Sequence, residues 1–343
     1  MQYLPNQSNS LFMANIVILS VNNALPSGLM GIADIFSLSG LNFVRESGKA
    51  ELNWNPNVIL ANHDGQAIVD GHGRTFDVDS DFDSIDHCDA VLVPGFIPNG
   101  QGHPPTVITD ARTQSWLKKQ RAQGTLMCGS CSGVFALGEA GILNNRQCTT
   151  TWWLHNELKQ RFPRANAVWA SELIDDNGII TAGGPLSWVT ISLHIVKKLA
   201  GINTAKVVAD FSVVDAIPTS QTLYVPEGYQ SSQDPFIAKA EYAIRKAHYQ
   251  TMSASDLANV MAVSERTLNR KLKDLTGETP KAFIDGIRIN HACTLLSTTN
   301  KSIKEIAFSL GYSDDSVFRR LFKKKMKMTP SSFQQQRSLS RNI

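Results

Sequence analysis

The chain has 343 residues, of which 42% are hydrophobic and 18% charged, an ordinary globular composition with room for two or three domains. Its net charge of +3 conceals an asymmetry, because residues 251–343 hold 16 Lys and Arg against 8 Asp and Glu, so only this part is suited to a polyanion. No apolar run is long enough to span a bilayer, and five cysteines without regular spacing argue against a disulfide scaffold.

The start of the chain lacks the basic region and cleavage pattern of a secretory signal, so we expect a cytoplasmic protein. Residues 1–13 are predicted to be a leader and a candidate for disorder. An α/β domain is then predicted over residues 14–214. Its strands are expected at 15–21, 57–61, 90–95 and 125–130, with helices at 28–41 and 110–122 and a polar hairpin before the third strand. This alternation predicts a doubly wound sheet, whose functional residues lie beyond the carboxyl ends of the strands.

Two strand ends stand out. One is followed by Pro94, Gly95 and Phe96, and the other by Cys131, Ser132 and Gly133 at the start of a helix. A cysteine on a sharp strand-to-helix turn faces a cleft, and nearby N–H groups are expected to lower its pKa. The alternatives are a small buried residue at a tight turn, or a redox dithiol formed with Cys128.

Other polar clusters give weaker signals. The alternating Asp77, Asp79, Asp81 and Asp83 resemble the start of a calcium loop but lack its glycine and final glutamate, so a solvated hairpin is expected. The scattered histidines have no metal-ligand spacing, so neither a metal nor a cofactor is predicted.

Residues 215–235 are rich in Pro, Ser and Gln and are predicted to be a linker. An all-α domain follows over 236–337, with a first helix at 236–249. Two helix-turn-helix units are expected at about 253–275 and 302–326, separated by a helix over 280–297. Ser264 and Ser313 are predicted N-caps, and Gly277 and Gly311 are predicted to end helices in the left-handed conformation.

The second helix of each unit leaves polar and basic side chains outside. They could read DNA or simply form solvated faces, and the doubled motif favours DNA. Two such helices held on one rigid helix would reach major-groove segments about 34 Å apart on one face of the duplex. The predicted DNA-binding residues are Ser264, Arg266, Thr267, Asn269, Arg270, Lys273, Ser313, Asp314, Asp315, Ser316, Arg319, Arg320, Lys323 and Lys324. Val317, with Phe318, Leu321 and Phe322, is expected to face inward, and Lys323, Lys324, Lys325 and Lys327 are expected to contact phosphate or solvent.

The residues of 301–330 resemble the C-terminal signature of AraC/XylS-type transcription regulators. The resemblance includes an Ile-Ala pair, Gly311 to Asp314, Phe318, Arg319, Phe322, Lys323 and Thr329-Pro330. Lys327 replaces a glycine that this family usually carries.

The front half resembles the PfpI-like branch of the class I glutamine amidotransferase-like fold, as joined to an AraC-type domain in GlxA-type regulators. The resemblance is carried by Cys131-Ser132-Gly133, Thr149-Thr150, Trp152, Arg161-Phe162-Pro163 and Thr181 to Gly184. It implies a flavodoxin-like doubly wound sheet followed by the all-α domain. Gly28 stands where the family's enzymes have an acid, and Thr151 where a histidine often follows, so no catalytic residue is expected.

These patterns predict a DNA-binding transcription regulator controlled by a small-molecule effector in a non-catalytic α/β domain. The expected ligand-binding residues are Gly95, Phe96, Cys131, Ser132, Thr151, Trp152 and Gly184. Expected partners are double-stranded DNA, the effector, a second copy in a homodimer and RNA polymerase, with no membrane. The alternative is a cysteine-dependent amidase or peptidase with an accessory DNA-binding domain.

Overall fold

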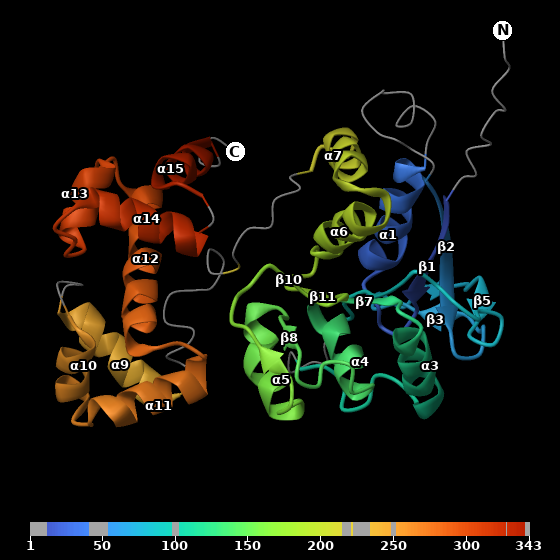
Figure 1. The fold of residues 1–343 in the computed structure, drawn as a ribbon, viewed down its shortest axis with the longest axis horizontal. Helices are drawn as coiled ribbons and strands as arrows, with labels where there is room; N and C mark the ends of the chain where they lie inside the picture. Colours follow the sequence, from blue (N-terminus) through green and yellow to red (C-terminus); the bar gives the residue numbers. More distant parts are fainter. Residues whose placement is uncertain are drawn as a thin grey trace, which may run out of the picture. The chain divides into compact units, whose positions relative to one another are not determined.

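The computed structural model describes residues 12–40, 54–97, 103–214, 221, 234–247, 252–326 and 328–339. The chain divides into two compact units, Met1–Pro218 and Thr219–Ile343 (Figure 1). The predicted leader up to residue 11, most of the predicted linker and Lys327 lie outside the described residues.

A seven-stranded sheet forms the centre of the first unit, with the strand order β10-β11-β7-β6-β1-β2-β5. Every neighbouring pair is parallel except β10 with β11. The strands of this sheet are β1 (Phe12–Leu19), β2 (Trp54–Asn62), β5 (Ser80–Asp81), β6 (Ala90–Val93), β7 (Leu126–Ser130), β10 (Leu173–Asp176) and β11 (Ile179–Ala182). The predicted doubly wound α/β fold is therefore confirmed, although β1 begins three residues earlier than the predicted strand.

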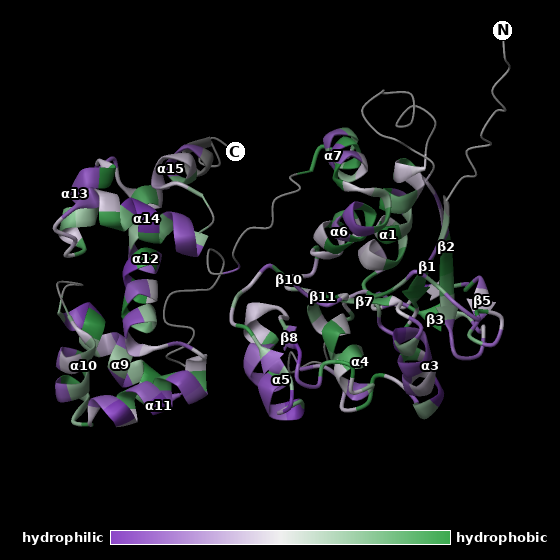
Figure 2. Ribbon diagram, in the orientation of Figure 1, coloured by the Kyte–Doolittle hydropathy of each residue, from purple (hydrophilic) through white to green (hydrophobic). Residues whose placement is uncertain are grey.

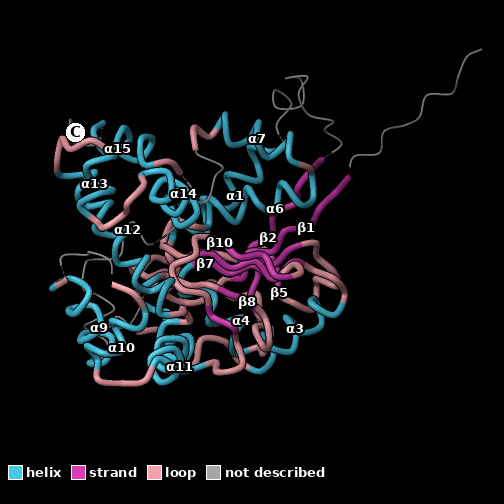
Figure 3. The backbone as a smooth tube through the Cα atoms, turned by 60° about the vertical axis from the view of Figure 1, so that its left-hand side comes forward, coloured by secondary structure: helices cyan, strands magenta, loops and turns pink. Residues whose placement is uncertain are grey.

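Helices cover both faces of this sheet (Figures 1 and 3). One face packs against α1 (Pro26–Ser39), α6 (Trp188–Ala200) and α7 (Ile202–Phe211), and the other against α3 (Ala111–Ala122), α4 (Val134–Glu139) and α5 (His155–Arg161). The remaining short elements are β3 (Ile68–Val69), β4 (Thr75–Phe76), β8 (Gln147–Cys148), β9 (Asn166–Ala167), η1 (Cys131–Gly133) and η2 (Trp152–Leu154).

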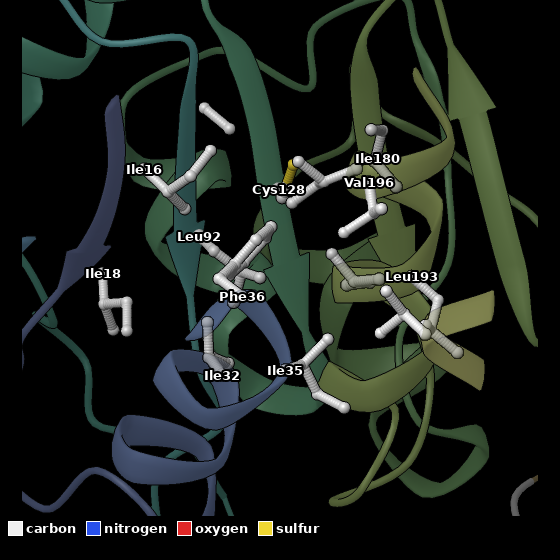
Figure 4. Packing of buried hydrophobic residues seen from close by; sticks show 14 of the residues in the cluster. Ile16, Ile18, Ile32, Ile35, Phe36, Leu92, Cys128, Ile180, Leu193 and Val196 are labelled. Atoms are coloured by element: carbon white, nitrogen blue, oxygen red, sulfur yellow. The ribbon is translucent and has the colours of Figure 1, made fainter. Parts of the chain in front are cut away.

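The strands read as continuous apolar runs because both of their faces are buried. In the close view of Figure 4, Ile32, Ile35 and Phe36 of α1 lie against side chains from the strands. Cys128 of β7 is fully buried in this cluster, so it is a core residue and not the exposed partner that a redox dithiol would need.

In the acidic stretch before β6, which runs from Asp77 to Asp83, two aspartates accept hydrogen bonds from the backbone. Asp79 accepts a 2.8 Å hydrogen bond from the backbone N–H of Leu60, and Asp81 accepts one of 2.9 Å from that of Ser84. The region contains the short antiparallel β3-β4 pair and the edge strand β5. Asp79 and Asp81 therefore stabilise the backbone next to the edge strand β5.

The second unit is helical. Its described helices are α9 (Pro235–Lys246), α10 (Ala254–Met261), α11 (Glu265–Thr276), α12 (Pro280–Thr298), α13 (Ile303–Ser309), α14 (Asp315–Met326) and α15 (Pro330–Leu339). They form two apolar cores, and the long helix α12 contributes to both, through Phe283 and Ile287 to one and through Ala292 and Leu296 to the other. In the described parts of the chain, every helix is too short or too polar to cross a membrane.

Candidate functional site

The helical unit contains an internal structural repeat. Ser253 and Ser302 both form capping boxes, with Asp256 and Glu305 respectively, at the starts of α10 and α13. The residues that follow these two helices, Ala262 and Gly311, have φ values of 55° and 82° and turn the chain in the left-handed conformation. Both predicted helix-turn-helix units are therefore present, with the first helices offset by 49 residues.

The second helices differ in their N-caps. Ser264 accepts a hydrogen bond from the Thr267 backbone N–H at 3.2 Å, as predicted. In the second unit the cap is Asp314, which accepts a 2.8 Å bond from the N–H of Ser316, so the predicted capping role of Ser313 is wrong. The turn after Gly311 is one residue longer than its counterpart, and this extra residue moves the cap to Asp314.

Because of this insertion, each residue of the recognition helix α14 corresponds to the residue of the recognition helix α11 that lies 50 positions earlier in the sequence. Three buried residues of α11, Leu268, Leu272 and Thr276, correspond to Phe318, Phe322 and Met326 of α14. The same offset pairs Arg270 with Arg320, and Lys273 with Lys323, on the exposed faces.

Most of the predicted DNA-binding residues lie on the exposed faces of these helices or at their caps, and α11 is hydrophilic along most of its length (Figure 2). Thr267 and Asp315 are half-buried. Thr267 Oγ1 lies 2.9 Å from Ser264 Oγ, and Asp315 Oδ2 accepts a 2.9 Å bond from Arg319 Nε. The guanidinium of Arg319 is thus held by its own helix.

Two expectations for α14 are wrong. Val317 does not face inward, because its side chain is 44% exposed. It precedes the buried Phe318 by about a quarter of a helical turn, so it points to a different side of the helix. Lys325 is not a solvated lysine, because its Nζ donates to Glu278 Oε1 at 2.8 Å and to the Ala282 carbonyl at 3.3 Å. Lys325 therefore connects α14 to the segment between α11 and α12.

The second candidate site is the turn after β7. Cys131 has a φ of 53°, a strained value for a residue other than glycine, and follows β7 directly. Its carbonyl accepts a 2.7 Å bond from Thr150 Oγ1. The neighbouring Ser132 Oγ accepts from the Phe96 N–H at 2.8 Å and donates to the Phe96 carbonyl at 2.9 Å. The two predicted ligand-contacting turns are thus joined, and the Phe96 N–H is already occupied.

The thiol is not activated as predicted. Cys131 is only 5% exposed, and its burial raises the pKa of the thiol to about 11, although hydrogen bonds from the Ser132 backbone and side chain act to lower it. Desolvation of the thiolate outweighs these bonds. At neutral pH the sulfur is therefore a protonated thiol.

Gly28 stands where no acid can fit. A Cβ placed on Gly28 would lie 2.7 Å from Pro94 Cβ, and one placed on Gly95 would lie 3.2 Å from Cys131 Cβ. The indole of Trp188 closes the other side, at 3.8 Å from the Gly28 position. Close packing of α1 against the strand ends thus excludes a side chain that could orient the thiol.

Buried polar atoms without a partner mark the same end of the sheet. Thr151 Oγ1 is buried without a hydrogen bond, and so are two atoms that the sequence did not single out, Ser130 Oγ and Trp188 Nε1. Such orphaned groups are unusual and favour a site for a polar molecule. Trp152 is half-buried and packs edge-on against Trp153, and Gly184 turns the chain before α6 with a φ of 97°. Among the described side chains there is no group of three His, Cys, Asp or Glu placed to hold a metal ion.

Comparison with known families and proteins divides the chain in the same way. Residues 46–198 match the DJ-1/PfpI family, and residues 257–336 match a helix-turn-helix domain family. The chain is 28% identical over 237 residues to the HTH-type transcriptional regulator GlxA of Rhizobium meliloti, covering 67% of this chain and 72% of that protein.

Two further similarities are to an enzyme and to a solved structure. An isonitrile hydratase of Pseudomonas putida is 29% identical over 128 residues, covering 37% of this chain and 52% of the enzyme. The crystal structure of a ThiJ/PfpI family protein from Pseudomonas syringae aligns with a TM-score of 0.50 at 16% identity, covering 69% of this chain and 93% of that one. The first unit therefore has a fold that also occurs in enzymes.

Proposed function

We infer that this chain, which joins a DJ-1/PfpI domain to an AraC-type helix-turn-helix domain, is a sequence-specific DNA-binding transcription regulator controlled by a small-molecule effector. The helical unit binds double-stranded DNA. The α/β unit holds the effector and catalyses no reaction.

The observation that carries this function is the repeat of a recognition helix, α11 and α14, on either side of the long helix α12 in the sequence. Each recognition helix buries an apolar stripe and leaves a polar, mainly basic face outside. The 19 residues of α12 extend for about 28 Å, and the helix contributes to the apolar cores of both helix-turn-helix units. We propose that α12, as one rigid helix, sets the distance between the two recognition helices.

The effector site that we propose lies around Gly95, Phe96, Cys131, Ser132, Thr151, Trp152 and Gly184. The orphaned hydroxyls of Thr151 and Ser130 and the Trp188 N–H support a polar ligand that completes their hydrogen bonds. Thermal-shift screening of the full chain against a metabolite library tests this site, because a molecule that binds only the native state raises the melting temperature. A hit should lose its effect in Thr151→Val, which removes the hydroxyl and keeps the shape.

The full chain tests DNA binding directly. Selection from a random duplex library should return a preferred site, and log K should fall linearly with log salt with a slope of about −0.9 per phosphate contact. No enrichment of any sequence, together with no salt-dependent affinity, would show that the function is wrong. We further propose that the protein acts in the cytoplasm as a homodimer formed through its α/β unit, and that it contacts RNA polymerase.

The rival function is a cysteine-dependent amidase or peptidase with an accessory DNA-binding domain, and the similarity to isonitrile hydratase favours testing it. A protonated Cys131 without an acid at Gly28 argues against such activity. Turnover of amide substrates that disappears in Cys131→Ala would establish the rival function.

A further inference from the structure

The recognition helix α14 exposes one large apolar side chain in its first turn. Val317 is 44% exposed, whereas Phe318, Phe322 and Met326 are fully buried and Leu321 is half-buried. The other exposed side chains of the helix are polar or charged: Ser316, Arg319, Arg320, Lys323 and Lys324. Single exposed apolar residues are common on protein surfaces, but Val317 lies on the face of α14 whose other exposed side chains are polar or basic.

The repeat places a similar residue in the other recognition helix. Val317 is the third residue of α14, and its counterpart Thr267 is the third residue of α11. Both are β-branched and carry methyl groups, and the Thr267 hydroxyl already lies 2.9 Å from Ser264 Oγ. In helix-turn-helix proteins the N-terminal residues of the recognition helix are the ones that contact base edges.

Arg320 lies on the same side of α14, because residues three apart are neighbours on a helix surface. Its guanidinium is exposed, whereas that of Arg319 is held by Asp315. An exposed arginine in this position suits the O6 and N7 atoms of a guanine. Val317 would then meet a base close to the one that Arg320 contacts.

Resting on the proposed DNA-binding function, we propose that Val317 is a specificity-determining residue that packs against the C5-methyl group of a pyrimidine in the major groove. That methyl group is the one apolar feature of the base edges there, carried by thymine and by 5-methylcytosine. Val317 would favour methylated pyrimidines without any hydrogen bond, and Arg320 would fix the register.

The test uses the full chain and its preferred duplex from library selection. Each thymine in the half-site that responds to Arg320→Ala is replaced in turn by uracil, which removes only the methyl group. One replacement should weaken binding about fourfold, equivalent to about 0.8 kcal/mol for a buried methylene-sized group. The difference should shrink to less than twofold in Val317→Ala and persist in Val317→Thr, which retains a methyl group.

A second arm replaces each cytosine of the same half-site by 5-methylcytosine. A gain in affinity that requires Val317 would identify 5-methylcytosine as the source of the methyl group, whereas a uracil effect that requires Val317 would identify thymine. Val260→Ala is the matched control, because Val260 is 55% exposed on α10, outside the recognition helices. It should leave both comparisons unchanged.

The proposal is overturned if no methyl substitution changes affinity, or if the changes are the same in wild type and Val317→Ala. Unchanged helical circular dichroism and melting of Val317→Ala ensure that a lost effect is local. Failure of the selection to return any preferred duplex would instead count against the proposed function, so the two failures are distinguishable.

Discussion

Lys325 of α14 donates a 2.8 Å hydrogen bond to Glu278, which follows α11, so one recognition helix is joined by an ion pair to the end of the other. The Lys325 ammonium also donates to the Ala282 carbonyl at the start of α12. A lysine with two protein partners has fewer donors left for a phosphate than its exposed neighbour Lys324.

The salt dependence of DNA binding should therefore separate these two lysines. Lys324→Ala should reduce the slope of log K against log salt by about 0.9, because one phosphate contact is lost. Lys325→Ala should leave the slope unchanged and lower the stability of the helical unit by about 0–1 kcal/mol, as expected for a partly exposed ion pair. Fluorescence anisotropy on a random duplex measures the slopes. Equal flattening in both variants would contradict this assignment.

Base reading should depend on Arg270 and Arg320, which occupy the same place in the two recognition helices. Arg270→Ala and Arg320→Ala should each weaken binding to the preferred site by about 1–3 kcal/mol and relax specificity at separate positions. Arg319→Ala is the matched control, since its guanidinium is held by Asp315, and it should have a smaller effect. A larger effect of Arg319→Ala than of Arg320→Ala would reverse the assignment.

The Cys131 thiol should resist alkylation near neutral pH. Because burial raises the pKa to about 11, its thiolate population should increase only as the pH rises toward that value. Iodoacetamide labelling followed by peptide mass spectrometry measures this, with the half-buried Cys293 as the internal comparison. Rapid labelling of Cys131 at pH 7 would show an activated thiol.

The variant Cys131→Ser should keep the fold and DNA binding and alter only the response to effector.

Acid should destabilise the α/β unit through His155. Burial, with a smaller effect of the Lys159 charge, lowers the pKa of this histidine from 6.5 to about 4. The unfolded chain gains a proton below pH 6.5 while the folded chain does not, so stability is full above pH 6.5 and declines as the pH falls toward 4. The total loss is up to roughly 3 kcal/mol.

Urea unfolding followed by tryptophan fluorescence reports on this unit alone, because all six tryptophans lie before residue 200. His155→Leu should flatten the dependence between pH 6.5 and 4. The same pH dependence in wild type and variant would assign the effect to other groups.

Gly28 and Gly286 should respond oppositely to alanine. Gly28→Ala should destabilise the α/β unit by about 1–3 kcal/mol, because its Cβ would meet Pro94 Cβ at 2.7 Å. Gly286→Ala lies within α12, where the nearest atom is Lys325 Nζ at 3.6 Å, and should stabilise the helical unit by up to about 1 kcal/mol. Urea unfolding read by tryptophan fluorescence for the first variant and by circular dichroism for the second measures both. A neutral Gly28→Ala would show that α1 can move away and leave room for an acid.

The sequence was sufficient where a signal is local and periodic. Buried strands such as β6 show continuous apolar runs, and the capping serines and left-handed glycines of the helical unit follow from their own conformational preferences. The one-residue insertion after Gly311 was missed, because Ser313 and Asp314 are both good N-cap residues and the sequence alone does not decide between them.

Long-range contacts account for the other differences. The pairing of Lys325 with Glu278 joins residues 47 positions apart, and no pattern in either helix indicates it. The pKa of Cys131 is set by how much protein surrounds the sulfur, a quantity that the strand-to-helix motif does not contain. Gly28 could be recognised as a missing acid from the resemblance, but the reason that nothing larger fits is the position of Pro94.

Because α12 belongs to both apolar cores, it fixes the position of one recognition helix relative to the other. This constrains the distance between the two DNA half-sites that the protein can bind. Adding one residue to α12 would rotate one helix-turn-helix unit relative to the other by about 100° and move it by about 1.5 Å along the helix axis. One recognition helix would then face away from the groove. Relatives with this architecture should therefore acquire new target genes by exchanging side chains on α11 and α14, whereas the distance between their two half-sites stays constant.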